Sequence, residues 1–74
     1  MNNKIRKTIQ TLHDQLGDIR ESLETIKDDE QIKYDNLPDS FRDGDMGENI
    51  QTAIDYLNEV IGSIEEAEAG LEEI

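Results

Sequence analysis

The chain has no cysteine and no tryptophan, and it carries one proline, one phenylalanine and two tyrosines among its 74 residues. Without cysteine it can form neither a disulfide nor a thiolate metal site. Its longest apolar run is the pair Val60 and Ile61, so we expect no membrane-spanning helix and no signal peptide. The resulting prediction is one soluble, cytoplasmic domain over residues 1–74 that makes no contact with a membrane.

Basic residues are also scarce: 7 Lys and Arg stand against 19 Asp and Glu, for a net charge of -12. Residues 1–33 carry six basic and seven acidic side chains, whereas residues 34–74 carry Arg42 alone against twelve acidic ones. Direct nucleic-acid binding is therefore not expected, because phosphate contacts need Lys and Arg. A host protein with a basic surface is the predicted partner, although acidity that serves solubility alone remains an alternative.

Groups for catalysis are few, because the chain has a single histidine, His13. Neighbouring acids on a helix point in different directions and into solvent, so they form no converging site. The segment 39–45 fails as a calcium loop, since Phe41 stands at the third ligand position and Ile50 stands where a bidentate Glu is required. We predict no enzymatic activity, no metal site and no cofactor.

Aliphatic residues in the first half follow an uninterrupted heptad repeat, which a strand cannot produce. Its a positions are Ile9, Leu16 and Leu23, and its d positions are Ile5, Leu12, Ile19 and Ile26. The pattern predicts a helix over about 3–33, capped by Asn2 or Asn3 and ended before Pro38.

The second half repeats the pattern, which predicts a helix over about 47–73 and a loop over about 34–46. The repeating residues are Ile50, Ile54, Leu57, Ile61, Ile64 and Leu71. Asp45 and Glu48 have the spacing of a capping box. Within the loop, Pro38 is expected to begin a short helical turn and Gly44 to end it in a left-handed conformation. The apolar residues expected to close this end are Tyr34, Leu37, Phe41 and Met46.

Two such helices predict an all-α fold, an antiparallel two-helix hairpin with coiled-coil-like packing. In the expected register Ile26 faces Ile54, Arg6 meets Glu72 and His13 meets Glu65. The a position at Glu68 is charged, so the apolar contact is expected to shift towards Ala67.

A second apolar stripe runs along the second helix, one residue before each a position. It consists of Ala53, Val60, Ala67 and Ile74. One hairpin would leave this stripe in water, and two helices alone provide little core. We therefore expect self-association through the stripe into a homodimeric four-helix bundle. The alternative is that the stripe binds a different protein.

The second helix also carries a series of acids expected to face a basic partner. They are Asp55, Glu59, Glu65, Glu66, Glu72 and Glu73. One hypothesis is a protein-binding module whose acids imitate a nucleic-acid backbone and inhibit a host protein. The alternative is a structural or assembly protein that acts through the apolar stripe of the second helix.

The segment Tyr34-Asp35-Asn36-Leu37-Pro38, followed by Gly47-Glu48 and by Ala53 to Leu57, carries a family resemblance. It resembles small acidic helical-hairpin proteins of unknown activity from phages and mobile elements of Gram-positive bacteria. Asp39 replaces the Glu that usually follows this core. The resemblance implies a phage or mobile-element origin and a helix-loop-helix shape, and it implies no chemistry.

Overall fold

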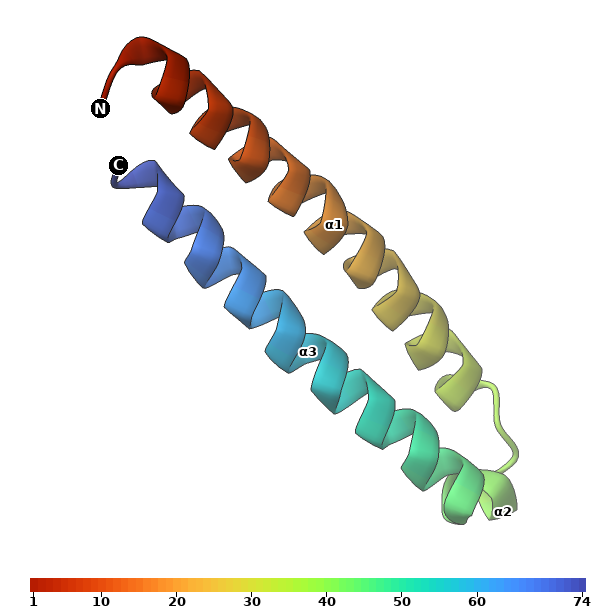
Figure 1. Ribbon diagram of the computed structural model, residues 1–74. Helices are drawn as coiled ribbons and strands as arrows, with labels where there is room; N and C mark the ends of the chain where they lie inside the picture. The colour runs from red at the N-terminus through yellow and green to blue at the C-terminus, as the bar shows by residue number, and fades with distance from the viewer.

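The computed structural model describes all 74 residues as three helices joined by short connections (Figure 1). They are α1 (Asn3–Asp35), α2 (Asp39–Arg42) and α3 (Asp45–Glu72). The all-α prediction is confirmed, since the two long helices pack together and no strand is present. The chain forms a rod of 59 × 14 × 12 Å. Its radius of gyration is 17.1 Å; a compact domain of this length would have a radius of about 11 Å.

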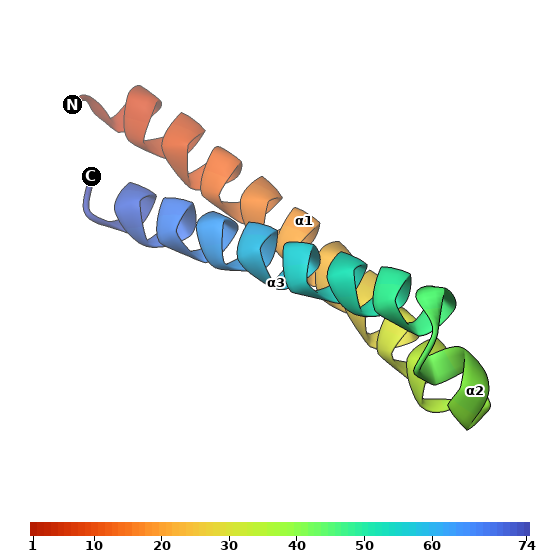
Figure 2. The same ribbon diagram turned by 90° about the horizontal axis from the view of Figure 1, so that it is seen from below.

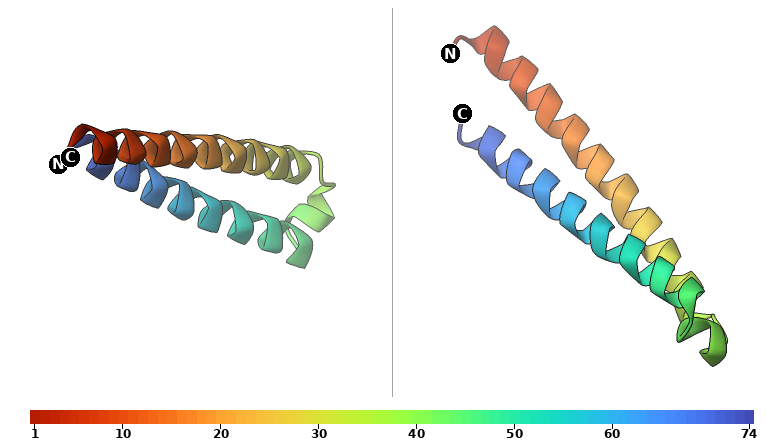
Figure 3. Two further views of the ribbon diagram at one scale, coloured as in Figure 1. Left: turned by 45° about the horizontal axis from the view of Figure 1, so that its top comes forward. Right: turned by 60° about the horizontal axis from the view of Figure 1, so that its bottom comes forward.

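The long helices run in opposite directions, so the two chain termini lie at the same end of the rod (Figure 1). They cross at a shallow angle, as the turned views show (Figures 2 and 3). None of the helices has an apolar stretch long enough to cross a membrane.

The start of α1 agrees with the prediction from the sequence, whereas the start of α3 does not. Asn2 caps α1, and its Oδ1 accepts a hydrogen bond from the Ile5 amide at 2.9 Å. The predicted capping box of α3 is wrong, because Gly44 occupies the N-cap position and offers no side chain. Asp45 and Glu48 instead lie in the first turn of α3, where negative charge suits the helix dipole.

The connection between the long helices differs from its prediction in two respects. Gly44 is not left-handed: its φ is -100° and its backbone is extended. Phe41 and Met46 do not close the end of the helix pair, because both are about half exposed, whereas Tyr34 and Leu37 are partly buried. Gly44 leads directly into a helix, so a left-handed stop is not needed there.

Arg42 and Gly47 hold this connection together. The Arg42 guanidinium donates through Nη2 to the carbonyls of Asp35 and Leu37, at 3.2 Å each, and lies over the Tyr34 ring. Gly47 is buried, and a Cβ there would collide with the Arg42 carbonyl. This close approach lets α2 pack against the first turns of α3 (Figure 2).

The contact between α1 and α3 uses a different side of α1 from the one predicted. The a residues Ile9, Leu16 and Leu23 face α3, but the e residues flank them instead of the d residues. The exposed d residues are Ile5, Leu12, Ile19 and Ile26. Two of the e residues, His13 and Arg20, reach carboxylates on α3, and this pairing favours the observed rotation of α1. As a result, the buried hydrophobic core consists of Ile54 and Ile61.

The register between the helices is also displaced from the predicted one. His13 meets Glu72 instead of Glu65, a shift of one heptad, and Arg6 makes no ion pair. Ile26 consequently does not lie opposite Ile54. The cause is the connection, in which α2 carries the chain past the end of α1 before α3 begins (Figure 1).

Candidate interaction surface

The acids predicted to bind a partner lie along the exposed sides of α3, and one of them, Glu72, reaches across to α1. We call this set the acidic face: Asp55, Glu59, Glu65, Glu66, Glu72 and Glu73. All six residues are exposed, and Glu72 alone among them makes an ion pair, with His13. The other five carboxylates are therefore open to solvent and to any cationic group that approaches.

The residues of the stripe predicted for self-association are all exposed; three lie on α3 and Ile74 follows the end of α3. Val60 and Ile74 are large hydrophobic residues about half exposed to solvent, and Ala53 and Ala67 are exposed beside them. Ile74 also lies near α1, because it lines a pocket together with Arg6 and Ile9.

A second set of exposed aliphatic residues lies on α1, although the heptad pattern predicts that they belong to the core. Ile5, Leu12, Ile19 and Ile26 are each between 46% and 51% exposed. Glu68 is the residue in the sequence that indicates this exposure. A charge at an a position requires a partner, and Arg20 at an e position of α1 is the basic residue within reach, so α1 turns its e side, and not its d side, towards α3.

The two exposed sets form a single surface. The His13–Glu72 contact joins the e sides of both helices, so the opposite sides of the helices also share one face. The register set by this contact and by Arg20–Glu68 places Ile26 about level with Val60, and Ile19 about level with Ala67. We call the combined set the apolar face: Ile5, Leu12, Ile19, Ile26, Ala53, Val60, Ala67 and Ile74.

A polar cluster lies inside the contact between the helices, centred on Arg20. Its Nε donates to Glu68 Oε1 at 2.7 Å, its Nη2 to Glu68 Oε2 at 3.4 Å and its Nη1 to Glu24 Oε1 at 3.3 Å. Hydrogen bonding to Glu68, and then to Glu24, raises the pKa of Arg20 further above its ordinary value. The predicted shift of the contact from Glu68 to Ala67 is wrong, because the ion pair lets Glu68 remain in the interface.

His13 lies between two carboxylates near the open end of the rod. Its Nε2 is 3.0 Å from Glu72 Oε1, and its Nδ1 is 3.4 Å from Asp14 Oδ1. Both ring nitrogens can donate at once only when the imidazole is protonated. The hydrogen bonds to Asp14 and to Glu72 accordingly raise the pKa of His13.

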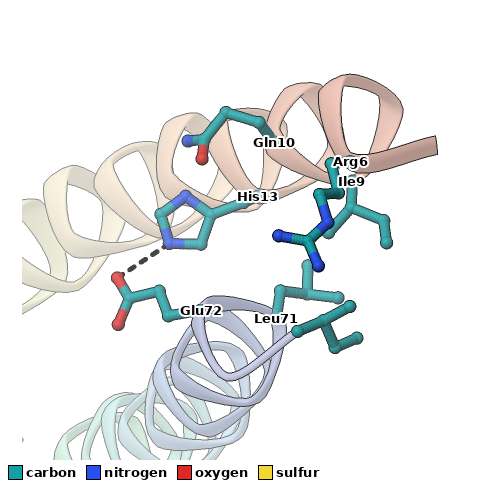
Figure 4. A pocket seen from close by; sticks show the side chains of 7 residues that line it. Arg6, Ile9, Gln10, His13, Leu71 and Glu72 are labelled. Carbon is teal, nitrogen blue, oxygen red and sulfur yellow. Dashed lines mark hydrogen bonds and ion pairs between the residues drawn. The ribbon is translucent and has the colours of Figure 1, made fainter. Parts of the chain in front are cut away.

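The pocket beside His13 is small and open, with a volume of about 160 Å³ (Figure 4). Arg6, His13 and Gln10 of α1 lie on one side, and Leu71 and Glu72 lie on the other. The remaining lining residues, Ile9 and Ile74, are apolar. No hydroxyl, thiol or amine nucleophile lines this pocket.

In comparisons with known proteins, no family model matches the chain, and no similar curated protein or solved structure was found. The interaction surfaces therefore rest on the residues and geometry of this chain.

Proposed function

We propose that this chain is a non-enzymatic protein-binding module whose acidic face binds a host protein with a basic surface. The observation that carries the proposal is the row of exposed carboxylates on α3, of which all but Glu72 lack an ion-pair partner. Such a surface attracts a cationic groove over distances of about 10 Å and directs the approach of its partner.

The regular spacing of these acids supports imitation of a nucleic-acid backbone. Glu59, Glu66 and Glu73 recur every seven residues, which spaces them by roughly 10 Å along one side of the helix. Glu65 and Glu72 repeat the interval on an adjacent side. A basic protein that normally holds phosphates could receive these rows, and the module would then act as an inhibitor. The proposed origin is a phage or mobile element, and the proposed site of action is the host cytoplasm.

In this proposal the helix pair acts as an antiparallel hairpin, and two hairpins form a homodimeric four-helix bundle. The bundle would present one acidic face on each side, so two basic surfaces could be bound together. It would need no cofactor and no direct contact with nucleic acid.

The test is capture of partners from a host lysate on the immobilised chain, at low and at high salt. The informative variant carries Glu59→Gln, Glu66→Gln and Glu73→Gln, which removes three charges and leaves the His13–Glu72 contact intact. The matched control removes three exposed charges from α1, by Glu21→Gln, Asp28→Asn and Asp29→Asn.

We expect the immobilised chain to capture a nucleic-acid-processing protein, and high salt to release it. The α3 variant should capture this protein at least about tenfold less well, whereas the α1 control should still capture it. A partner that binds both variants equally and withstands high salt would contradict the proposal. That result would instead favour the alternative function, a structural or assembly role that acts through the apolar stripe of α3.

A further inference from the structure

We infer that the apolar face binds a second copy of this chain, and that α1 supplies the larger aliphatic side chains of that interface. The inference deepens the proposed function, on which it rests, by naming the partner of this face. The stripe on α3 and just after it offers two alanines, Val60 and Ile74, whereas α1 adds Ile5, Leu12, Ile19 and Ile26.

The distribution of charge around the apolar face identifies the kind of partner. Its border on α3 consists of Asn49, Tyr56, Ser63 and Gly70, and its border on α1 consists of Thr8, Gln15, Ser22 and Asp29. Asp29 is the one charged residue on either border, although the chain carries a net charge of -12. A basic partner would find no complement here, whereas the same uncharged face of a second copy meets it without repulsion.

The dimensions of the rod agree with a dimer of ordinary size. In the register described above, the apolar face extends along about 28 residues of the rod, from Ile5 to the level of Ala53, or roughly 42 Å. With the rod's width of 14 Å, it spans roughly 600 Å², near the lower end of what each partner contributes to a standard protein interface. A two-fold symmetric contact uses the same surface on both copies, and this face is apolar along its whole length.

The core of the helix pair also indicates that this face is covered. Ile54 and Ile61 are the buried hydrophobic residues of the described chain, whereas eleven large hydrophobic residues are exposed. Packing two apolar faces together would bury Ile19 and Val60 near the middle of a four-helix bundle. The acidic faces would remain outside, because the side of each pair that carries His13 and Glu72 points away from the contact.

The experiment measures the mass of the full chain in solution by sedimentation equilibrium, over a range of concentrations. The test variant is Ile19→Gln with Val60→Gln, since Gln forms helices at least as well as Ile and Val. The control introduces the same residue on the acidic face, as Glu59→Gln with Glu66→Gln. We expect the native chain to have twice its mass of 8.5 kDa. The double substitution in the apolar face should raise the dissociation constant at least about a hundredfold, and the control should not weaken the dimer.

A second measurement keeps the inference testable if the apolar-face variant does not fold. The thermal midpoint of the native chain should rise with concentration, because association stabilises the folded state. A native chain of single mass with a concentration-independent midpoint would overturn the inference, as would an apolar-face variant that dimerises normally. Failure of lysate capture with an intact dimer would count against the acidic-face function alone.

Discussion

Arg20 of α1 and Glu68 of α3 form a two-point ion pair across the contact between the long helices. The pairing atoms are Nε with Oε1 at 2.7 Å and Nη2 with Oε2 at 3.4 Å, and the Glu68 side chain is 13% exposed. Two parallel hydrogen bonds fix both the distance and the direction of approach. This pair therefore selects the register in which the aliphatic residues of α1 and α3 meet.

Removing one partner of this pair should destabilise the protein. We expect Glu68→Ala to lower the free energy of unfolding by about 1–2 kcal/mol, a figure reduced for the partial exposure of Arg20. The control is Glu66→Ala, an exposed acid without an ion pair, which should change stability by less than about 0.5 kcal/mol. Urea denaturation at one fixed protein concentration provides the measurement. Equal losses in the two variants would show that the Arg20–Glu68 pair contributes nothing specific.

Gly47 should tolerate no side chain, because a Cβ there meets the backbone carbonyl of Arg42. We expect Gly47→Ala to destabilise the protein by about 2 kcal/mol or more, since the backbone must move to admit the methyl group. Gly62 is the matched control: it lies within the same helix, and a Cβ there meets open space. Gly62→Ala should therefore stabilise the protein by about 0.5–1 kcal/mol. Thermal unfolding of both variants measures the contrast, and a neutral Gly47→Ala would contradict the close approach.

His13 should make stability depend on pH in a defined direction. Folding raises the pKa of His13 through Asp14 and Glu72, so the protonated form is favoured in the folded state. Its contribution to stability is complete below the ordinary histidine pKa of about 6.5 and is lost as the pH rises through the raised folded value. The measurement is the urea midpoint between pH 6 and pH 8.5, for the native chain and for His13→Gln. The native chain should weaken across this range relative to the variant. A His13 imidazole whose pKa in the folded protein is at or below the ordinary value would contradict its pairing with Asp14 and Glu72.

Arg42 should stabilise the connection locally, because its guanidinium donates to the carbonyl of Asp35 at the end of α1 and to that of Leu37 just after it. We expect Arg42→Met, which retains an aliphatic stem, to cost about 1 kcal/mol and to speed amide exchange around residues 36–44. The control is Lys33→Met: Lys33 is a mostly exposed residue that pairs with Glu30 in the preceding turn. Hydrogen exchange resolved by residue makes the comparison. Uniform acceleration along α3, without a local effect, would contradict this role for Arg42.

Local patterns in the amino-acid sequence were enough to predict the helical class and the approximate limits of the long helices. The heptad repeat predicted helices over about 3–33 and 47–73, and the structure has them over Asn3–Asp35 and Asp45–Glu72. A cap at Asn2 or Asn3 also followed from the sequence, because capping is a local interaction between a side chain and the next turn, and the structure has it at Asn2. The absence of Lys and Arg from α3 was equally readable, since it depends on composition.

Contacts between the helices set which side of α1 faces α3 and how far the two helices are displaced along each other. Heptad positions a, d and e lie on adjacent stripes, so the repeat permits either of two rotations of α1. The pairing of Arg20 with Glu68 favours one rotation, and the α2 turn with its contact at Gly47 sets the displacement. The ion pair joins residues 48 positions apart in the chain, so no local pattern reveals it. The apolar face is the consequence, because the rotation that places Arg20 in the contact leaves Leu12 and Ile19 outside it.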